Sequence, residues 1–372
     1  MTVLGGAAAI WSAVPIALVA AVLAGFAPSA AGAVSTAGTW HMAMEVPGSG
    51  ALNAGGNAQV RAVSCGSAGN CSAGGFYTDG SGHVQAFLAK EVNGHWGTAF
   101  EVSASGGLNA GGNAQLFSVS CGSTGDCSAG GFYTDGSGHL QAFLVKEVNG
   151  HWGNAFEVSA SGGLNAGGNA QLVSVSCGSA GDCSAGGFYT DGSGHGQAFL
   201  VKQVNAHWGN AFEVSASGAL NAGGNAQVRA VSCPSAGNCS AGGFYTDGFS
   251  HVQALLVKEM NAHWGNAFEV SNSGNLNVGG NAQLGALSCG SAGNCSAGGF
   301  YVDGSGHGQA LLVTEVNSHW GNAFEVSNSG NLNAGGNAQL GAMSCPSAGN
   351  CAAGGFYRDG SGNRQAFIVS QS

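Results

Sequence analysis

The chain has 372 residues, of which 70 are glycine, and 8 Lys and Arg against 18 Asp and Glu give it a formal net charge of −10. Hydrophobic residues make up 44% of the chain, which argues against intrinsic disorder because disordered chains combine low hydrophobicity with high charge. The acidic balance argues against a nucleic-acid partner, since binding phosphate groups needs a basic face.

Residues 1–33 have the features of an export signal. Residues 1–38 carry no charged side chain, and residues 14–26 are almost wholly apolar. Ala31-Gly32-Ala33 follows, a small-x-small site of the kind that signal peptidase cuts. The apolar run is shorter than the ~20 residues that a spanning helix needs. We therefore predict a secreted, extracellular protein, cut after Ala33 and without a membrane segment once the signal is removed. An uncleaved anchor is the alternative, because the signal lacks Lys and Arg.

Twelve cysteines fall in six pairs with five residues between the members of each pair. An even number of cysteines in an exported chain indicates a disulfide framework. The strict repetition makes pairing within each repeat the simplest choice. A metal site is the alternative, but it needs about four ligands per ion, and each repeat supplies two thiols. The predicted disulfides are Cys65–Cys71, Cys121–Cys127, Cys177–Cys183, Cys233–Cys239, Cys289–Cys295 and Cys345–Cys351.

The cysteine pairs recur every 56 residues, and so does a tryptophan at positions 40, 96, 152, 208, 264 and 320. Self-similarity on this scale indicates a solenoid, a propeller or an array. The repeats fill residues 40–372, so we predict a single repeat domain after a short linker at residues 34–39.

One unit, taken in chain order at residues 59–102, contains four predicted strands. They cover residues 59–65, 71–78, 83–92 and 96–102. Asp79-Gly80-Ser81-Gly82 and Asn93-Gly94 are the turn signals after the second and third strands. No window of helical length shows a 3.6-residue apolar stripe. The sequence therefore predicts an all-β fold.

Four antiparallel strands repeated six times predict a six-bladed β-propeller. A parallel solenoid would use shorter coils of roughly 20 to 30 residues. The first repeat element after the signal is a fourth strand, residues 40–46, and the last is a third strand, residues 364–370. We expect the N-terminal strand to complete the sixth blade and close the fold, because an open sheet edge is a liability.

Three motifs resemble known repeats. Ala73-Gly74-Gly75 at the end of a strand, then a turn, an apolar strand and a Trp, resembles kelch-type blade order. Residues 74–82 followed by Gln-Ala-Phe-Leu at 85–88 are similar to bacterial extracellular repeats named for a His-Ala-Phe core. The Ser-Cys-x5-Cys-x-Ala-Gly-Gly unit is similar to repeats of secreted bacterial proteins of unknown role. The resemblance implies a secreted propeller and no enzyme activity.

Antiparallel order places the turns of each blade on two faces. One face receives the disulfides and the Asn-Gly-His-Trp turn, and the other receives a repeated set of Asp, His and Asn. We predict this second set as the candidate ligand-binding residues, with turn capping by Asp and Asn as the alternative. The set is Asp79, Asp135, Asp191, Asp247, Asp303 and Asp359; His83, His139, His195, His251 and His307; Asn57, Asn113, Asn169, Asn225, Asn281 and Asn337. Calcium prefers about six to eight oxygen ligands, more than one Asp per blade provides. We therefore predict no metal or cofactor, with Ca²⁺ as the weaker option.

Other repeated positions predict packing. The glycine doublets, such as Gly74-Gly75, are expected to let blades approach closely. The repeated Trp is expected between blades, with an exposed sugar-stacking role as the alternative. The position of residue 61 varies, which predicts exposure at the channel or the rim. Its occupants are Arg61, Phe117, Val173, Arg229, Gly285 and Gly341.

These observations favour a secreted, monomeric, non-catalytic binding module for glycans or a surface protein. Near-identical blades suit multivalent weak binding. A six-bladed extracellular glycoside hydrolase or lyase is the first alternative. Catalysis by two carboxyl groups needs environments that differ, whereas every carboxylate except Asp126 and Asp182, which replace Asn70-type residues, recurs in at least four repeats. A passive surface-coat protein is the second alternative.

Overall fold

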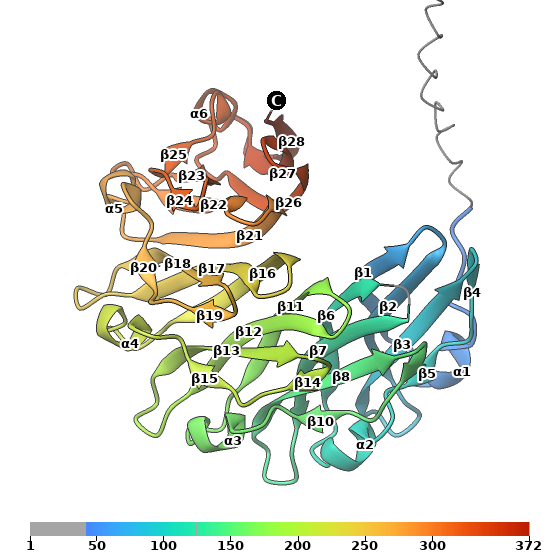
Figure 1. Ribbon diagram of the computed structural model, residues 1–372. Coiled ribbons are helices and arrows are strands. Elements are labelled where there is room, and N and C mark those ends of the chain that lie inside the picture. The colour runs from blue at the N-terminus through green and yellow to red at the C-terminus, as the bar shows by residue number, and fades with distance from the viewer. Residues whose placement is uncertain (1–41, 124, 372) are drawn as a thin grey trace, which may run out of the picture. The chain divides into compact units, whose positions relative to one another are not determined.

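The computed structural model describes residues 42–123 and 125–371, and Glu45 onward forms one compact unit. The predicted signal (1–33), the linker (34–39) and Trp40 lie outside the described residues. The compact unit is built from six antiparallel sheets in chain order, which we call the first to the sixth blade (Figure 1). Among the described residues, no helix is long and apolar enough to cross a membrane.

The first blade contains β1 (Ala58–Ser67), β2 (Asn70–Thr78), β3 (Val84–Val92), β4 (His95–Trp96) and β5 (Phe100–Glu101). Neighbouring strands are antiparallel, and β4 and β5 both pair with β3. The predicted fourth strand is thus interrupted at residues 97–99. The reason is a contact outside the blade, because Ala99 N donates to Pro47 O at 2.7 Å.

The next four blades repeat this order. The second blade contains β6 (Ala114–Ser123), β7 (Asp126–Thr134), β8 (Leu140–Val148), β9 (His151–Trp152) and β10 (Phe156–Glu157). The third contains β11 (Gln171–Ser179), β12 (Asp182–Thr190), β13 (Gly196–Val204), β14 (His207–Trp208) and β15 (Phe212–Glu213). The fourth contains β16 (Gln227–Ser235), β17 (Asn238–Thr246), β18 (Val252–Met260), β19 (His263–Trp264) and β20 (Phe268–Glu269). The fifth contains β21 (Ala282–Ser291), β22 (Asn294–Val302), β23 (Gly308–Val316), β24 (His319–Trp320) and β25 (Phe324–Glu325).

A single helical turn precedes the first strand of each blade, an element that the sequence did not predict. The six turns are α1 (Ser49–Leu52), α2 (Ser105–Leu108), α3 (Ser161–Leu164), α4 (Ser217–Leu220), α5 (Ser273–Leu276) and α6 (Ser329–Leu332). Four residues are too few to show a helical stripe. In α2, α4 and α5 the first serine donates a side-chain hydrogen bond to the carbonyl group three residues earlier, as Ser105 Oγ does to Val102 O at 2.6 Å.

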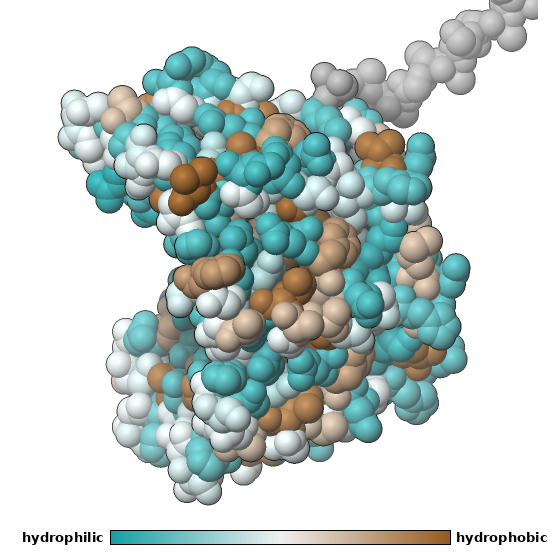
Figure 2. All heavy atoms as spheres, turned by 90° about the vertical axis from the view of Figure 1, so that its left-hand side faces the viewer, coloured by the Kyte–Doolittle hydropathy of each residue, from teal (hydrophilic) through white to brown (hydrophobic). Residues whose placement is uncertain are grey.

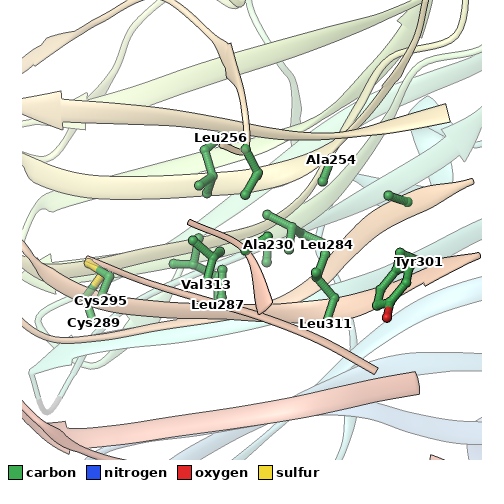
Figure 3. Close-up of a cluster of buried hydrophobic side chains, with 14 residues drawn as sticks. Ala230, Ala254, Leu256, Leu284, Leu287, Cys289, Cys295, Tyr301, Leu311 and Val313 are labelled. Atoms are coloured by element: carbon green, nitrogen blue, oxygen red, sulfur yellow. A yellow bond between two sulfur atoms is a disulfide. The ribbon is translucent and has the colours of Figure 1, made fainter. Parts of the chain in front are cut away.

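The hydrophobic core lies between consecutive blades. In the cluster of Figure 3, Leu284 and Leu287 of the fifth blade pack with Leu256 of the fourth. Trp320 packs against the same cluster, and Trp152, Trp208 and Trp264 pack in the equivalent clusters. The prediction that the repeated Trp lies between blades is confirmed for these four.

The two glycines of each doublet have different neighbours. A Cβ at Gly130 would lie 2.7 Å from Leu172 Cδ2 of the following blade, whereas a Cβ at Gly131 would lie 1.9 Å from Gln115 O of its own blade. The missing side chain at the first glycine therefore lets the next blade pack closely, as predicted. The missing side chain at the second glycine lets the first strand of the same blade pack closely.

All six predicted disulfides are present, each with a sequence separation of 6. Closing so short a loop contributes about 2 kcal/mol in the chain-entropy model. The disulfides lie within single blades, but a hydrogen bond beside them joins consecutive blades. Ser64 Oγ of the first blade accepts this bond from Cys121 N of the second blade at 3.0 Å.

The sixth blade has three strands, β26 (Gln339–Ser347), β27 (Asn350–Arg358) and β28 (Arg364–Ser370). Residues 42–46 carry no strand, so the described residues do not include the predicted fourth strand of this blade. Ile368 of β28 is 85% exposed, although its equivalent Leu88 is fully buried. Val63 of β1 is 55% exposed, although its equivalent Val119 is 7% exposed.

Candidate functional site

The turns of each blade lie on two faces, as predicted. On one face Gly94 N donates to Gly69 O at 2.8 Å, which joins the turn after β3 to the turn after β1. On the other, Gly55 N donates to Thr78 O at 2.9 Å, which joins the loop before β1 to the turn after β2. We call this second face the crown face.

Asp79 caps its own turn on the crown face. Its Oδ1 accepts hydrogen bonds from Ser81 N at 2.8 Å and His83 N at 3.0 Å, and its Oδ2 accepts one from Gln85 Nε2 at 3.2 Å. The hydrogen bond from Gln85 and those from the two backbone amides hold the pKa of Asp79 below its ordinary value. The capping alternative is therefore confirmed for this residue. Its side chain is still 26% exposed and can accept a further hydrogen bond.

The same three hydrogen bonds recur at every equivalent aspartate, and the glutamine six residues ahead donates to Oδ2 each time. Backbone amides two and four residues ahead donate to Oδ1 of Asp135, Asp191, Asp247, Asp303 and Asp359. The pKa of each of these carboxyl groups is lowered. At Asp135 burial acts to raise the pKa, but the bonds from His139 N and Gln141 outweigh it.

The histidine that follows each turn lies between two blades. The side chain of His83 is 59% exposed, and its Nδ1 is 3.9 Å from Asp79 Oδ2. A Cβ at Gly112 of the second blade would lie 2.7 Å from His83 Cδ2. Val84 N also donates to Gly112 O at 2.9 Å. The first blade's turn therefore meets the second blade's loop.

We define a crown junction as the Asp-to-His turn of one blade with the loop of the next blade. The structure contains five: residues 79–83 with 109–113, 135–139 with 165–169, 191–195 with 221–225, 247–251 with 277–281, and 303–307 with 333–337. In four of them the distance from His Nδ1 to Asp Oδ2 lies between 3.6 and 4.0 Å. The predicted Asp and His side chains are thus brought together.

Three of the predicted asparagines make a side-chain hydrogen bond to a glutamine of their own blade. Asn113 Oδ1 accepts a hydrogen bond from Gln115 Nε2 at 2.9 Å, and Asn169 and Asn281 do the same with their own glutamines. Asn57 lies outside the five junctions, since nothing lies within 4 Å of a Cβ built at the adjacent Gly56. Asn225 and Asn337 lie in the loops of the third and fifth junctions.

The asparagine four residues earlier organises each junction, and the sequence analysis missed it. Asn109 is 4% exposed. Its Nδ2 donates to Val84 O and to Gln85 Oε1 of the preceding blade, both at 3.0 Å, and its Oδ1 accepts from Asn113 N at 2.7 Å. The repeated Leu-Asn-x-Gly-Gly-Asn motif contained the signal, because both of its asparagines recur.

A tyrosine–glutamate pair lies within each of the first five blades. Tyr133 Oη donates to Glu157 Oε2 at 2.8 Å, which ties β7 to β10. Burial, then the hydrogen bond and charge of Glu157, raise the pKa of the Tyr133 phenol. The equivalent bonds join Tyr77 to Glu101, Tyr189 to Glu213, Tyr245 to Glu269 and Tyr301 to Glu325.

The variable position lies at a register shift in the first strand of each blade. Arg61, Gly285 and Gly341 are exposed, as predicted, whereas Phe117, Val173 and Arg229 are half-buried. The guanidinium of Arg61 lies 5.0 Å from the ring centroid of Phe76 and 4.8 Å from that of Phe117. Arg229 lies over Phe244 at 4.7 Å, and burial lowers the pKa of Arg229.

Asp126 and Asp182, which replace the asparagine that the other four blades carry at the same repeat position, lie away from the crown face. Asp126 Oδ2 accepts from Ser123 Oγ at 3.3 Å and Asp182 Oδ2 accepts from Ser179 Oγ at 3.4 Å, both beside a disulfide. Within the described residues, no three His, Cys, Asp or Glu side chains are grouped so that they could hold a metal ion. The crown junctions offer exposed hydrogen-bonding groups, such as the Asp79 carboxylate and the His83 imidazole. Figure 2 shows a surface on which hydrophilic residues surround separate small apolar areas.

No family model matches the chain, and no curated protein matches it. Solved structures that resemble it include the subtype N11 neuraminidase-like protein of A/flat-faced bat/Peru, at 11% identity and a TM-score of 0.43, covering 90% of this chain and 93% of that chain. The Hadza microbial sialidase Hz136 has 6% identity and a TM-score of 0.44, with 84% of this chain and 65% of that chain covered. A mutant of the Aleuria aurantia lectin in complex with alpha-methyl-L-fucoside has 10% identity and a TM-score of 0.37, with 84% of this chain and 91% of that chain covered.

Proposed function

We propose that this protein is a secreted, non-catalytic carbohydrate-binding protein that contacts sugar hydroxyl groups at its crown junctions. The observation that carries the proposal is the recurrence, at five places on the same face, of an Asp that accepts a hydrogen bond from the backbone N–H of a following His; at four of them the two side chains lie within 4.0 Å of each other. Each arrangement offers a partly exposed carboxylate oxygen as acceptor and an exposed imidazole, as the 26% and 59% exposures of Asp79 and His83 illustrate. Linked weak sites gain avidity when one ligand spans several of them.

The test is binding of the mature protein to a panel of immobilised oligosaccharides and polysaccharides. In the crown variant, His83, His139, His195, His251 and His307 are all replaced by Ala. The turns should remain folded, because it is the backbone N–H of each histidine that donates to the aspartate. We expect at least tenfold weaker binding than wild type.

The matched control replaces the five histidines of the opposite face, His95, His151, His207, His263 and His319, with Ala. All five are exposed, and we expect wild-type binding. Equal binding by the two variants would contradict the proposal. Release of reducing ends from a bound glycan, abolished by Asp126→Asn or Asp182→Asn, would support the hydrolase alternative instead.

Secretion is part of the proposal. Six disulfides are typical of oxidising compartments and rare in the cytosol. Expression of the full chain in a bacterial host should give a protein in the periplasm or medium whose N-terminal residue is Val34. A full-length protein retained in the membrane fraction would support the anchor alternative.

We also propose that residues 40–46 complete the sixth blade and close the propeller. The support is a cavity of about 190 Å³ lined by Leu312, Phe324 and Val369. Their equivalents in the preceding pair of blades are Leu256, Phe268 and Val313, which pack around Trp320. Trp40 has the repeat position that would fill this space.

The test of closure compares Ile368→Ala with Leu200→Ala. Leu200 is fully buried, and its truncation should cost about 2–5 kcal/mol of unfolding free energy. If the sixth blade meets the first, Ile368→Ala should destabilise the protein to a similar degree. A negligible effect of Ile368→Ala would show that this face stays open.

A further inference from the structure

One crown junction differs from the other four. The turn of the fourth blade reads Asp-Gly-Phe-Ser-His at residues 247–251, where the first, second, third and fifth blades read Asp-Gly-Ser-Gly-His. The loop that it meets carries Val278, where the other five loops carry alanine. Three departures from the repeat, Phe249, Ser250 and Val278, therefore fall at a single junction.

The two apolar departures are exposed. Phe249 is 83% exposed and Val278 is 71% exposed. Phe249 lies beside His251, with ring centroids 6.3 Å apart. Val278 belongs to the loop that meets His251, since a Cβ at Gly280 of that loop would lie 2.8 Å from His251 Cδ2. A single exposed apolar residue is ordinary on a protein surface. Phe249 beside an exposed imidazole, with Val278 in the adjoining loop, makes what we call a small apolar platform.

The third departure adds backbone strain at the same turn. Ser250 has φ +67°, and the equivalent residue is glycine in the other five blades. A non-glycine residue in the left-handed region costs free energy, and such residues cluster at ligand-binding sites. The turn is held in its repeat conformation all the same, since Asp247 Oδ1 accepts from Phe249 N at 2.8 Å and from His251 N at 2.9 Å.

Polar groups border the platform. Asp247 Oδ2 is 3.6 Å from His251 Nδ1, and the two side chains are 22% and 52% exposed. A binding site for a small molecule typically combines apolar and aromatic surface with a few placed polar groups. A neutral sugar fits this combination, because one face of a hexopyranose ring presents C–H groups to an aromatic side chain while its hydroxyl groups reach the carboxylate and imidazole. The carboxylate and the net charge of −10 disfavour an anionic sugar.

We propose that the fourth crown junction is the principal sugar subsite, which holds a neutral hexopyranose by stacking its C–H face on Phe249. The inference rests on the proposed function and deepens it, since it assigns one junction a role that the other four lack. The remaining junctions add weaker contacts to a longer glycan.

Saturation-transfer NMR on the mature protein tests the subsite, with methyl β-galactopyranoside and methyl β-glucopyranoside as probes. We expect transfer to at least one probe, strongest at the ring protons of a single face. Phe249→Ser restores the residue that the other five blades carry, so the turn should fold normally. This variant should bind the probe about tenfold more weakly.

Introducing the departures of the fourth junction at another junction should create a second sugar subsite. Ser193→Phe combined with Ala222→Val builds the same platform at the third junction, where Gly194 already occupies the strained position with φ +84°. We expect this variant to bind two probe molecules where wild type binds one.

Undiminished transfer to Phe249→Ser would overturn the inference. If the five-histidine crown variant still loses binding to the glycan panel, the proposed function stands without the principal subsite. If Phe249→Ser no longer binds the probe while the crown variant binds glycans normally, the sugar subsite at the fourth junction is supported. Binding at the repeated His–Asp pairs is then contradicted. A fall in sedimentation coefficient caused by Phe249→Ser would show instead that the platform joins two copies of the chain.

Discussion

The imidazole of His83 lies against Gly112 of the following blade so closely that a Cβ at position 112 would come within 2.7 Å of its Cδ2. Gly56 has almost the same backbone conformation, with φ +79° against +78°, but nothing within 4 Å of its Cβ position. The two glycines therefore separate the cost of the backbone conformation from the cost of displacing the histidine.

We predict that Gly112→Ala and Gly56→Ala each lower the unfolding free energy by about 1–2 kcal/mol, because both place a side chain in the left-handed region. Only Gly112→Ala should move the ring of His83, seen as a shift of its ring-proton resonances. Denaturant unfolding and NMR measure the two effects. An unchanged His83 resonance in Gly112→Ala would contradict the contact.

The second glycine of each doublet should tolerate no side chain. A Cβ at Gly187 would lie 1.9 Å from Gln171 O, a backbone atom that cannot move aside, whereas a Cβ at Gly192 would meet only Ala166 Cβ at 3.5 Å. Gly187→Ala should therefore destabilise the protein by more than about 3 kcal/mol, and Gly192→Ala by less than about 1 kcal/mol. Similar unfolding midpoints for the two variants would refute the assignment.

A buried ion pair between blades should make stability depend on pH. Glu259 is 3% exposed and its Oε1 is 3.7 Å from Lys202 Nζ. Burial raises the pKa of Glu259, and the charge of Lys202 offsets only part of the rise. The folded state thus binds the proton more tightly than the unfolded state, so this contribution to stability is present below about pH 4.5 and is lost as the pH rises through the raised pKa.

Glu259→Gln should remove this dependence. The third blade already carries Gln203 at the same repeat position, and Lys146, the equivalent of Lys202, donates from Nζ to Ala206 O at 2.7 Å. We predict that the variant is at least as stable as wild type at pH 7. Glu91→Gln, at the same repeat position in the first blade, is the control. A loss of several kcal/mol at pH 7 in Glu259→Gln alone would show that the ion pair is net stabilising.

The capping aspartates should give the opposite dependence. Their lowered pKa values mean that the folded state releases the proton more readily than the unfolded state. Their contribution is present above the unfolded pKa of about 3.8 and is lost as the pH falls through the lowered folded values. Urea unfolding between pH 5 and pH 2.5 should show a decline that is smaller in Asp135→Asn, with Asp126→Asn as the control. An identical decline in Asp135→Asn and wild type would contradict the assignment.

The repeat made much of the fold predictable. The 56-residue period located the blades and paired the cysteines, and the turn residues placed three of the four strands to within a few positions. The interruption of the fourth strand was not predictable, because its cause is a hydrogen bond to the preceding loop, from Ala99 N to Pro47 O. Contacts between blades leave no local pattern in the sequence.

The same limit applies to the candidate site. The turn chemistry of Asp79 was readable from Asp-Gly-Ser-Gly, because an aspartate before glycines commonly caps a turn. Which of Asn109 and Asn113 is buried could not be predicted from the sequence, because both recur in every repeat. Only packing between blades distinguishes them. The exposure of Phe249 likewise depends on a turn that projects it away from the blades.

The hydrogen bond from Cys121 N to Ser64 Oγ connects the disulfide of the second blade to the first blade. Equivalent bonds tie Cys177 to Ser120, Cys233 to Ser176, Cys289 to Ser232 and Cys345 to Ser288. A sulfur–sulfur bond that immobilises one cysteine therefore also fixes the position of a serine in the blade before it. Reduction of one disulfide would therefore loosen the contact between that blade and the preceding blade, as well as its own hairpin.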